Sequence, residues 1–164
     1  MRFSPLVLML GLATSTLAIP AAGQRPDNQL SPRSVDYARR GEAALAAGNY
    51  AAADDALETA LVLDPRNRGA FVSMAKVAIK QKLFGQAIRL TNKALSLEPT
   101  DRDALGIQGE AMVDAGAVPR ARETLIKLQK LCAGPCPQAA ALSAAIARGP
   151  TLAQVKPVTP KKSN

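Results

Sequence analysis

The sequence contains no histidine and no tryptophan, and aromatic residues make up only 3% of its 164 residues. Without histidine it has no Ser-His or Cys-His nucleophile pair, no H-E-x-x-H zinc motif and no imidazole base for catalysis near neutral pH. The G-x-x-x-x-G-K-[ST] loop that binds nucleotide phosphates is also missing. We therefore expect a protein that is not an enzyme and that uses no cofactor and no metal.

Cysteine is scarce, and its two copies lie close together as Cys132 and Cys136. A metal site needs more ligands than this pair supplies, and a redox pair usually has the C-x-x-C spacing. We therefore predict a structural disulfide that joins the end of one helix to the start of the next. A thiol-redox role for the pair is the alternative.

Long apolar runs are absent except near the N-terminus. Residues 1–23 combine a charged Arg2, an apolar stretch and the small residues Ala21-Ala22-Gly23, which together predict a signal peptide cleaved near Gly23. The expected location is periplasmic or secreted, in a bacterium, and an uncleaved membrane anchor is the alternative. Residues 24–33 are polar and include two prolines, so we expect a flexible linker there.

Positive charge is abundant, with a formal net charge of +8. It is concentrated in residues 68–101 and in the segment 149–164, which is rich in Pro, Lys and Thr and predicted to be a disordered basic tail. No aromatic residues interleave with the cations, so nucleic acid is not an expected partner. Peripheral contact of the tail with anionic surfaces remains an open possibility.

A period of 34 residues runs through the middle of the chain. It relates Pro65 to Pro99, and it relates three residues in each of three further sets, which are Tyr37, Phe71 and Leu105; Gly41, Ala75 and Gly109; and Ala53, Ala87 and Ala121. A period of this length predicts stacked supersecondary units. Within each unit the apolar residues fall at helical spacing in two blocks, so each unit is predicted to be a helix hairpin. Small residues at matching places indicate that the first helix of a hairpin passes close to the second.

The expected helices cover 34–47, 50–63, 68–81, 84–97, 102–115 and 118–131, and a further helix at 137–148 is expected to cap the array. Gly48 and Gly116 suit the left-handed turn inside a hairpin, whereas Lys82 either takes the same place at some strain or has a different turn around it. Asn67 and either Thr100 or Asp101 are expected to cap the helices that follow them. The predicted fold is all-α, an α-solenoid of three helix-turn-helix hairpins plus a C-terminal capping helix.

Two phrases of the sequence resemble the tetratricopeptide repeat: Tyr37-x-x-Arg40-Gly41-x-x-Ala44 and Phe71-x-x-Met74-Ala75-x-x-Ala78. Each is followed by the expected alanine and proline, and a third unit around Gly109 is a weaker match. The resemblance implies a domain over 34–148, with repeats at about 34–67, 68–101 and 102–131. It also implies a non-catalytic adaptor that binds a protein or peptide partner, and no small-molecule substrate is expected.

Arrays of this family bind peptides on a concave face lined by the first helix of each hairpin. At the corresponding places the resemblance points to a partner-binding groove made of Val72, Lys76, Ile79, Lys80, Glu110 and Val113. The alternative function is a basic surface that binds anionic lipid, cell-wall polymer or nucleic acid through Lys76, Lys80, Lys82, Arg89, Lys93 and the tail.

Overall fold

The computed structural model describes residues 29–151, which contain helices and no strand. The seven helices are α1 (Pro32–Ala46), α2 (Tyr50–Leu63), α3 (Arg68–Lys80), α4 (Phe84–Leu97), α5 (Arg102–Asp114), α6 (Val118–Lys130) and α7 (Pro137–Arg148). None of the helices in this part of the chain is both long and apolar enough to cross a membrane. The predicted signal peptide 1–23 lies outside the described residues, as do residues 24–28 of the predicted linker and 152–164 of the predicted tail.

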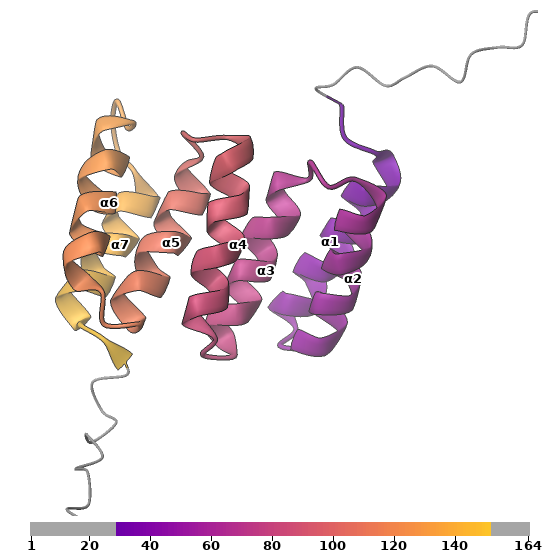
Figure 1. Ribbon diagram of the computed structural model, residues 1–164, viewed down its shortest axis with the longest axis horizontal. Coiled ribbons are helices and arrows are strands. Elements are labelled where there is room, and N and C mark those ends of the chain that lie inside the picture. The colour runs from indigo at the N-terminus through magenta and orange to yellow at the C-terminus, as the bar shows by residue number, and fades with distance from the viewer. Residues whose placement is uncertain (1–28, 152–164) are drawn as a thin grey trace, which may run out of the picture.

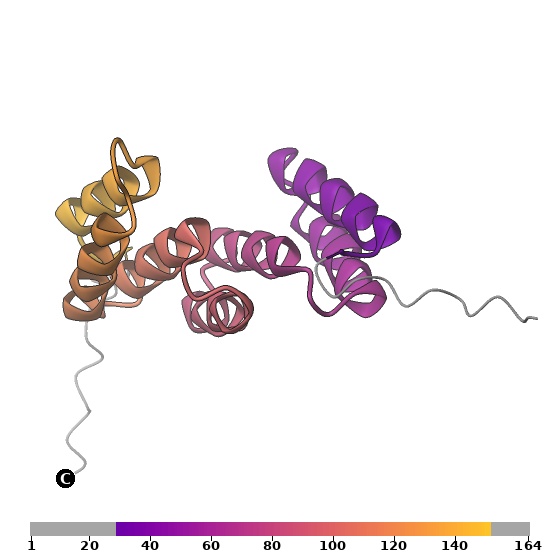
Figure 2. The same cartoon turned by 90° about the horizontal axis from the view of Figure 1, so that it is seen from above.

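The helices pack as three successive antiparallel hairpins, and α7 packs on α5 and α6. Figure 1 shows that α2, α4 and α6 form the layer nearest the viewer, with α1, α3, α5 and α7 behind them. Seen from above in Figure 2, the row of hairpins is bent, and α1 and α7 rise on the same side of the bend. The predicted all-α solenoid is confirmed, and its inner, concave side belongs to α1, α3, α5 and α7.

The helix boundaries follow from local sequence signals, and every helix begins and ends within two residues of its expected span. Three helices start with a side-chain cap that accepts a hydrogen bond from a free amide. Asn49 caps α2, Asn67 caps α3 and Asp101 caps α5, each through a bond of 2.9–3.1 Å. Of the two candidates for α5, the cap is therefore Asp101 and not Thr100.

The turn inside each hairpin uses a left-handed backbone residue. The φ angles are +75° at Gly48, +63° at Lys82 and +83° at Gly116. Glycine adopts this conformation without steric cost, whereas the Cβ of a lysine meets the following carbonyl group. The strained turn expected at Lys82 is therefore present, and the middle hairpin keeps the geometry of its neighbours.

Close packing within the first hairpin depends on a missing side chain. A Cβ atom added to Gly41 would lie 2.5 Å from Cγ of Leu57 on α2 and 3.2 Å from the carbonyl oxygen of Ala53. Ala53 is itself fully buried, as are its two counterparts in the later hairpins. The prediction that small residues allow the two helices of a hairpin to approach each other is confirmed at this position.

Gly109 serves a different contact from the one expected for it. A Cβ atom there would lie 2.5 Å from Cδ2 of Leu142, which belongs to α7 and not to the second helix of the same hairpin. Leu142 is only 1% exposed. The small residue makes room for the capping helix, because α7 lies directly against α5 at the end of the row.

A buried hydrogen-bond network joins the start of α1 to the connection between α2 and α3. The backbone N–H of Ser31 donates to Oδ2 of Asp64 at 2.9 Å, and Nδ2 of Asn67 donates to Oγ of Ser34 at 2.9 Å. The Ser34 hydroxyl in turn donates to the carbonyl oxygen of Ala60 at 2.7 Å. These bonds link the start of α1 to the end of α2 and to the connection that follows it, and they fix where α1 begins.

The connection between α6 and α7 carries a disulfide between Cys132 and Cys136. Both cysteines are half-buried and pack beside an apolar cluster that contains Leu105, Leu128 and Ala139. The bond closes a loop of a few residues directly before Pro137, the first residue of α7. It therefore restrains the position from which the capping helix starts.

Candidate functional site: a groove on the inner helices

Two adjoining hollows lie on the inner helices. The larger has a volume of about 450 Å³ and is lined by Leu45, Ala46, Lys76, Ile79, Lys80, Ile107 and Glu110. The smaller has a volume of about 160 Å³ and is lined by Lys76, Asp103, Gly106, Ile107, Glu110, Gln138, Ala141 and Leu142. Because Lys76, Ile107 and Glu110 line both hollows, we treat them as one inner groove that crosses α1, α3, α5 and α7.

Four of the six predicted groove residues line the inner groove, namely Lys76, Ile79, Lys80 and Glu110. They come from two neighbouring inner helices, α3 and α5, which contact each other directly. Lys76 and Lys80 are one helical turn apart and exposed, while Ile79 and Glu110 are half-buried. The structure thus brings an apolar side chain, two cations and one carboxylate to the same surface.

The expectation that Val72 and Val113 form the apolar floor of this groove is wrong. Val72 is 4% exposed and packs with Ala94 and Ala104, while Val113 is fully buried in the cluster around Met112 and Leu142. Both valines point toward the adjoining hairpin or helix and not toward the groove. A stripe of residues three to four apart covers a wide arc of a helix, so it includes the packed edge as well as the open face.

The large apolar residues that do line the groove on α1, α3 and α5 are Leu45, Ile79 and Ile107, and Ala141 and Leu142 of α7 line its far end. Ile107 and the α7 residues were not identified from the sequence. Carrying the 34-residue step from Ile107 into the capping helix leads to Ala141, so the period itself held the missing signal. The period points to Ala141 only if α7 continues the row of inner helices, which the structure shows.

The two walls of the inner groove differ in charge. On α3, Lys76 and Lys80 form no ion pair among the described residues. On the neighbouring helices, Glu42 accepts a hydrogen bond from the Ser73 hydroxyl at 2.9 Å, and Asp103 accepts one from Nε2 of Gln138 at 2.8 Å. Glu42 and Asp103 are thus partly engaged, and Glu110 lines both hollows beside Lys76. Lys76 and Lys80 form no ion pair with a described residue and are available to a ligand.

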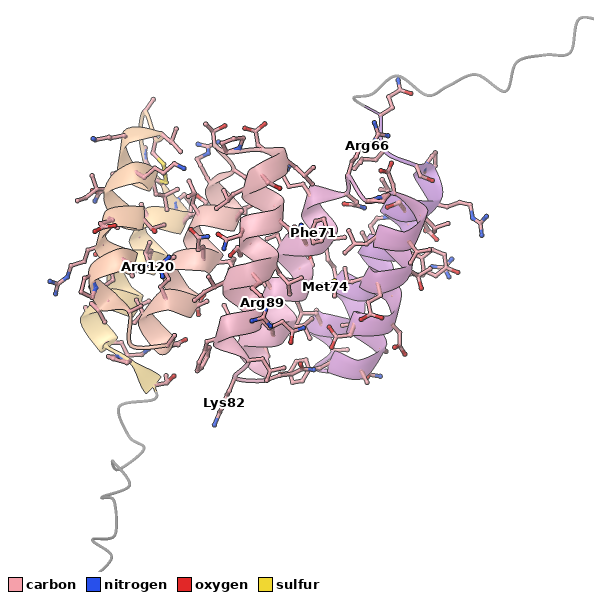
Figure 3. All side chains as sticks on the ribbon, viewed as in Figure 1. Arg66, Phe71, Met74, Lys82, Arg89 and Arg120 are labelled. Carbon is pink, nitrogen blue, oxygen red and sulfur yellow. A yellow bond between two sulfur atoms is a disulfide. The ribbon has the colours of Figure 1, made fainter. Side chains whose placement is uncertain are left out.

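The basic residues predicted to share one surface lie on different faces. Lys76 and Lys80 line the inner groove. Figure 3 shows Arg89 on α4, on the opposite side of the molecule, and Lys82 at the end of the α3–α4 hairpin. The sequence gives the composition of this set correctly but cannot divide it between faces, and the structure does not bring its members together.

Within residues 29–151, no three Cys, Asp or Glu side chains gather in a way that could hold a metal ion. The disulfide lies between α6 and α7 and contributes no residue to the inner groove. The groove is suited to binding, through apolar contact and charge.

Comparison with known proteins agrees with this geometry. Residues 44–109 match the sequence model of the tetratricopeptide repeat family. No sequence among curated proteins matches the chain.

Several solved structures are similar in fold. They include the first tetratricopeptide domain of Spaghetti (RPAP3) bound to the HSP90 peptide SRMEEVD, with TM-score 0.66 and 19% identity over 73% of this chain and 97% of that one. The TPR2B domain of yeast Sti1 in complex with pHsp70 has TM-score 0.66 and 18% identity over 72% and 98%. The Sgt2 domain from Aspergillus fumigatus has TM-score 0.66 and 21% identity over 73% and 80%.

The fold and the groove together define a helical-repeat solenoid, a class that presents a binding surface on its inner helices. More specifically, residues 44–109 match the tetratricopeptide repeat in sequence, and the three hairpins with α7 share the fold of solved tetratricopeptide repeat domains.

Proposed function

We propose that this protein is a non-catalytic adaptor that binds a peptide or helix of a partner protein in the inner groove. The observation that carries the proposal is the continuous groove across α1, α3, α5 and α7, with exposed cations beside apolar side chains. Two of the structural neighbours are complexes with chaperone-derived ligands, an HSP90 peptide and pHsp70, which supports a peptide ligand for this surface.

The residues of the groove favour a particular ligand chemistry. Leu45, Ile79 and Ile107 offer apolar contact, and Lys76 and Lys80 offer unpaired positive charge within one helical turn. A peptide with one large apolar side chain next to an acidic residue matches both features. We therefore expect the preferred ligands to be acidic and short of lysine and arginine.

A displayed peptide library, selected on the chain from Gln24 onward, tests this proposal. This form retains all seven helices and the contacts among them. We expect acidic peptides with an apolar anchor to be enriched, and Ile79→Ser to weaken their binding by roughly tenfold or more, as is typical of a central apolar contact. Lys76→Glu is expected to weaken binding of the same peptides more than Ile79→Ser does.

Val62→Ser is the matched control, because Val62 on the outer helix α2 is 83% exposed and removed from the groove. It is expected to leave peptide binding unchanged. Equal binding by wild type, Ile79→Ser and Lys76→Glu would show that the ligand uses another surface, and the groove assignment would then be wrong.

We also propose that the adaptor works after export, in the periplasm or outside the cell. Support comes from the sequence of residues 1–23 and from the disulfide, because a disulfide persists in oxidising compartments. N-terminal sequencing of the protein recovered from the periplasmic fraction should give Gln24 as the first residue. Recovery of the uncleaved chain in the cytoplasm would refute this proposal.

A further inference from the structure

The outer helices differ sharply in charge from one end of the row to the other. Helix α2 carries the carboxylates Asp54, Asp55 and Glu58 and no cation. Helix α4 carries Arg89 and Lys93 and no carboxylate. Helix α6 carries Arg120, Arg122, Lys127 and Lys130, with Glu123 as its single carboxylate. We refer to the six cations on α4 and α6 as the outer basic patch.

The side chains of the outer basic patch are exposed and lie outside the ion pairs of the described part of the chain. All six are exposed, and none of them forms an ion pair with another described residue. Figure 3 shows Arg89 and Arg120 on the face toward the viewer, which is opposite the inner groove. The six cations have no ion-pair partner among the described residues, so the patch is available to an anionic partner.

Two large apolar side chains lie among the cations. Leu97 is 44% exposed and follows Arg89 and Lys93 at intervals of four residues along α4. Ile126 is 53% exposed and stands between Arg122 and Lys130 at the same interval on α6. Residues four apart share a helix face, so each outer helix presents a stripe of cations with one apolar side chain.

We propose that the outer basic patch docks the protein onto the surface of an anionic lipid bilayer. Lys and Arg near such a surface are attracted by the phosphate headgroups, and isolated apolar side chains can enter the interface between them. The outer helices lie on the convex side of the bent row (Figure 2), and docking on a bilayer requires only charge and apolar contact there. Single-stranded nucleic acid usually needs aromatic stacking, and the aromatic residue of α4, Phe84, is 6% exposed.

The charge of α2 determines how the protein is oriented on the bilayer. Its three carboxylates are repelled by an anionic bilayer, so α4 and α6 approach the surface and the first hairpin stays farther away. The inner groove then faces away from the lipid and remains open to a peptide. The docking surface is therefore independent of the function proposed for the groove, and each can fail without the other.

Sedimentation with lipid vesicles tests the proposal, using the chain from Gln24 onward so that residues 1–23 cannot insert by themselves. We expect binding to vesicles that contain phosphatidylglycerol, no binding to pure phosphatidylcholine, and weaker binding as salt rises. Replacing Arg89, Lys93, Lys127 and Lys130 by Gln is expected to weaken binding at least about tenfold. Ile126→Ser should reduce the part of the binding that survives at high salt.

The matched control replaces Arg33, Lys76, Lys80 and Lys82 by Gln, which removes the same charge from other faces of the protein. It is expected to weaken vesicle binding less than about twofold, because long-range attraction alone is screened within a Debye length. Equal losses from the two quadruple variants would show that only net charge matters and would overturn the proposal. Failure of the wild type to bind anionic vesicles, with or without binding to a single-stranded oligonucleotide, would overturn it as well.

Discussion

Asp64 is a buried carboxylate that accepts hydrogen bonds from two separate segments. Burial by itself would raise its pKa, but hydrogen bonds from the side chain of Arg66, the amide of Ser31 and the amide of Arg66, with the charge of Arg66, hold the pKa below its ordinary value. The ionised form is therefore the one that ties the start of α1 to the α2–α3 connection. Loss of the negative charge of Asp64 would weaken these hydrogen bonds and so the contact between the start of α1 and the α2–α3 connection.

This lowered pKa makes stability depend on pH in a definite direction. The ionised carboxylate stabilises the fold above the ordinary pKa of aspartate, about 4, and the contribution is lost as pH falls through the lower folded value. We expect Asp64→Asn to cost about 1–3 kcal/mol at neutral pH and to make the acid loss of Tm shallower. Circular dichroism melts across the acid range measure both, with exposed Asp55→Asn as control. Parallel acid profiles for wild type and Asp64→Asn would contradict this account.

Gly41 is the second residue on which the first hairpin depends. A methyl group there would meet Leu57, which is fully buried and cannot move outward freely, and the backbone carbonyl of Ala53. We expect Gly41→Ala to destabilise the protein by about 1–3 kcal/mol in chemical denaturation, despite the better helix propensity of alanine.

Gly85→Ala is the control for this substitution, because Gly85 is an exposed helical residue with only the Arg89 guanidinium within reach of an added methyl group. It is expected to stabilise by about 0.5–1 kcal/mol through helix propensity alone. If the two alanine variants changed stability in the same direction, close packing at Gly41 would not be the reason for the small residue.

At the scale of the element, the turn between α3 and α4 carries a strain that its two counterparts lack. Lys82 has a φ of +63°, at a position where the other hairpins have glycine. Lys82→Gly is expected to raise the free energy of unfolding by about 0.5–1 kcal/mol, since the left-handed conformation then has no Cβ penalty. Lys82→Ala keeps the Cβ atom and should change little. A stabilising Lys82→Ala would indicate that charge, and not backbone conformation, is responsible.

Helix α7 is held by two neighbouring helices and by the disulfide before it. It packs on α5 and α6 alone, and its first residue directly follows the disulfide. In the chain-entropy model a bond that closes so short a loop stabilises by about 2 kcal/mol. We expect Cys132→Ser with Cys136→Ser to lower stability by a similar amount and to speed amide hydrogen exchange first in α7. Uniform faster exchange in all helices would contradict a local role.

Sequence patterns predicted the elements well because their signals are local. Proline after an outer helix, asparagine or aspartate before an inner one, and glycine in the turn each act within a few residues. What each helix contacts is not local. Gly109 matched Gly41 in the repeat pattern, yet its neighbour is Leu142 in α7, a contact that depends on where the row stops.

At the scale of the whole molecule, the repeat pattern identified the face that forms the groove but not its floor. Lys76, Ile79, Lys80 and Glu110 do line the inner groove, as the repeat pattern predicts for these places on the inner helices. The pattern misplaced Val72 and Val113, because apolar residues suit an open groove and a packed edge equally well. Curvature and the gap between successive helices decide between the two, and neither is encoded in a single repeat.

The row of helices ends differently at its two sides. It begins with a complete hairpin, α1 and α2, and within the described residues it stops on α7, an inner helix with no outer partner. If a second copy placed its own α1 and α2 against this end, one of these helices could pack on α7, and the other would have no helix to pack on. We therefore expect that copies do not extend one another into a filament, as repeats with matched ends can, and that sedimentation of the concentrated protein shows no open-ended growth.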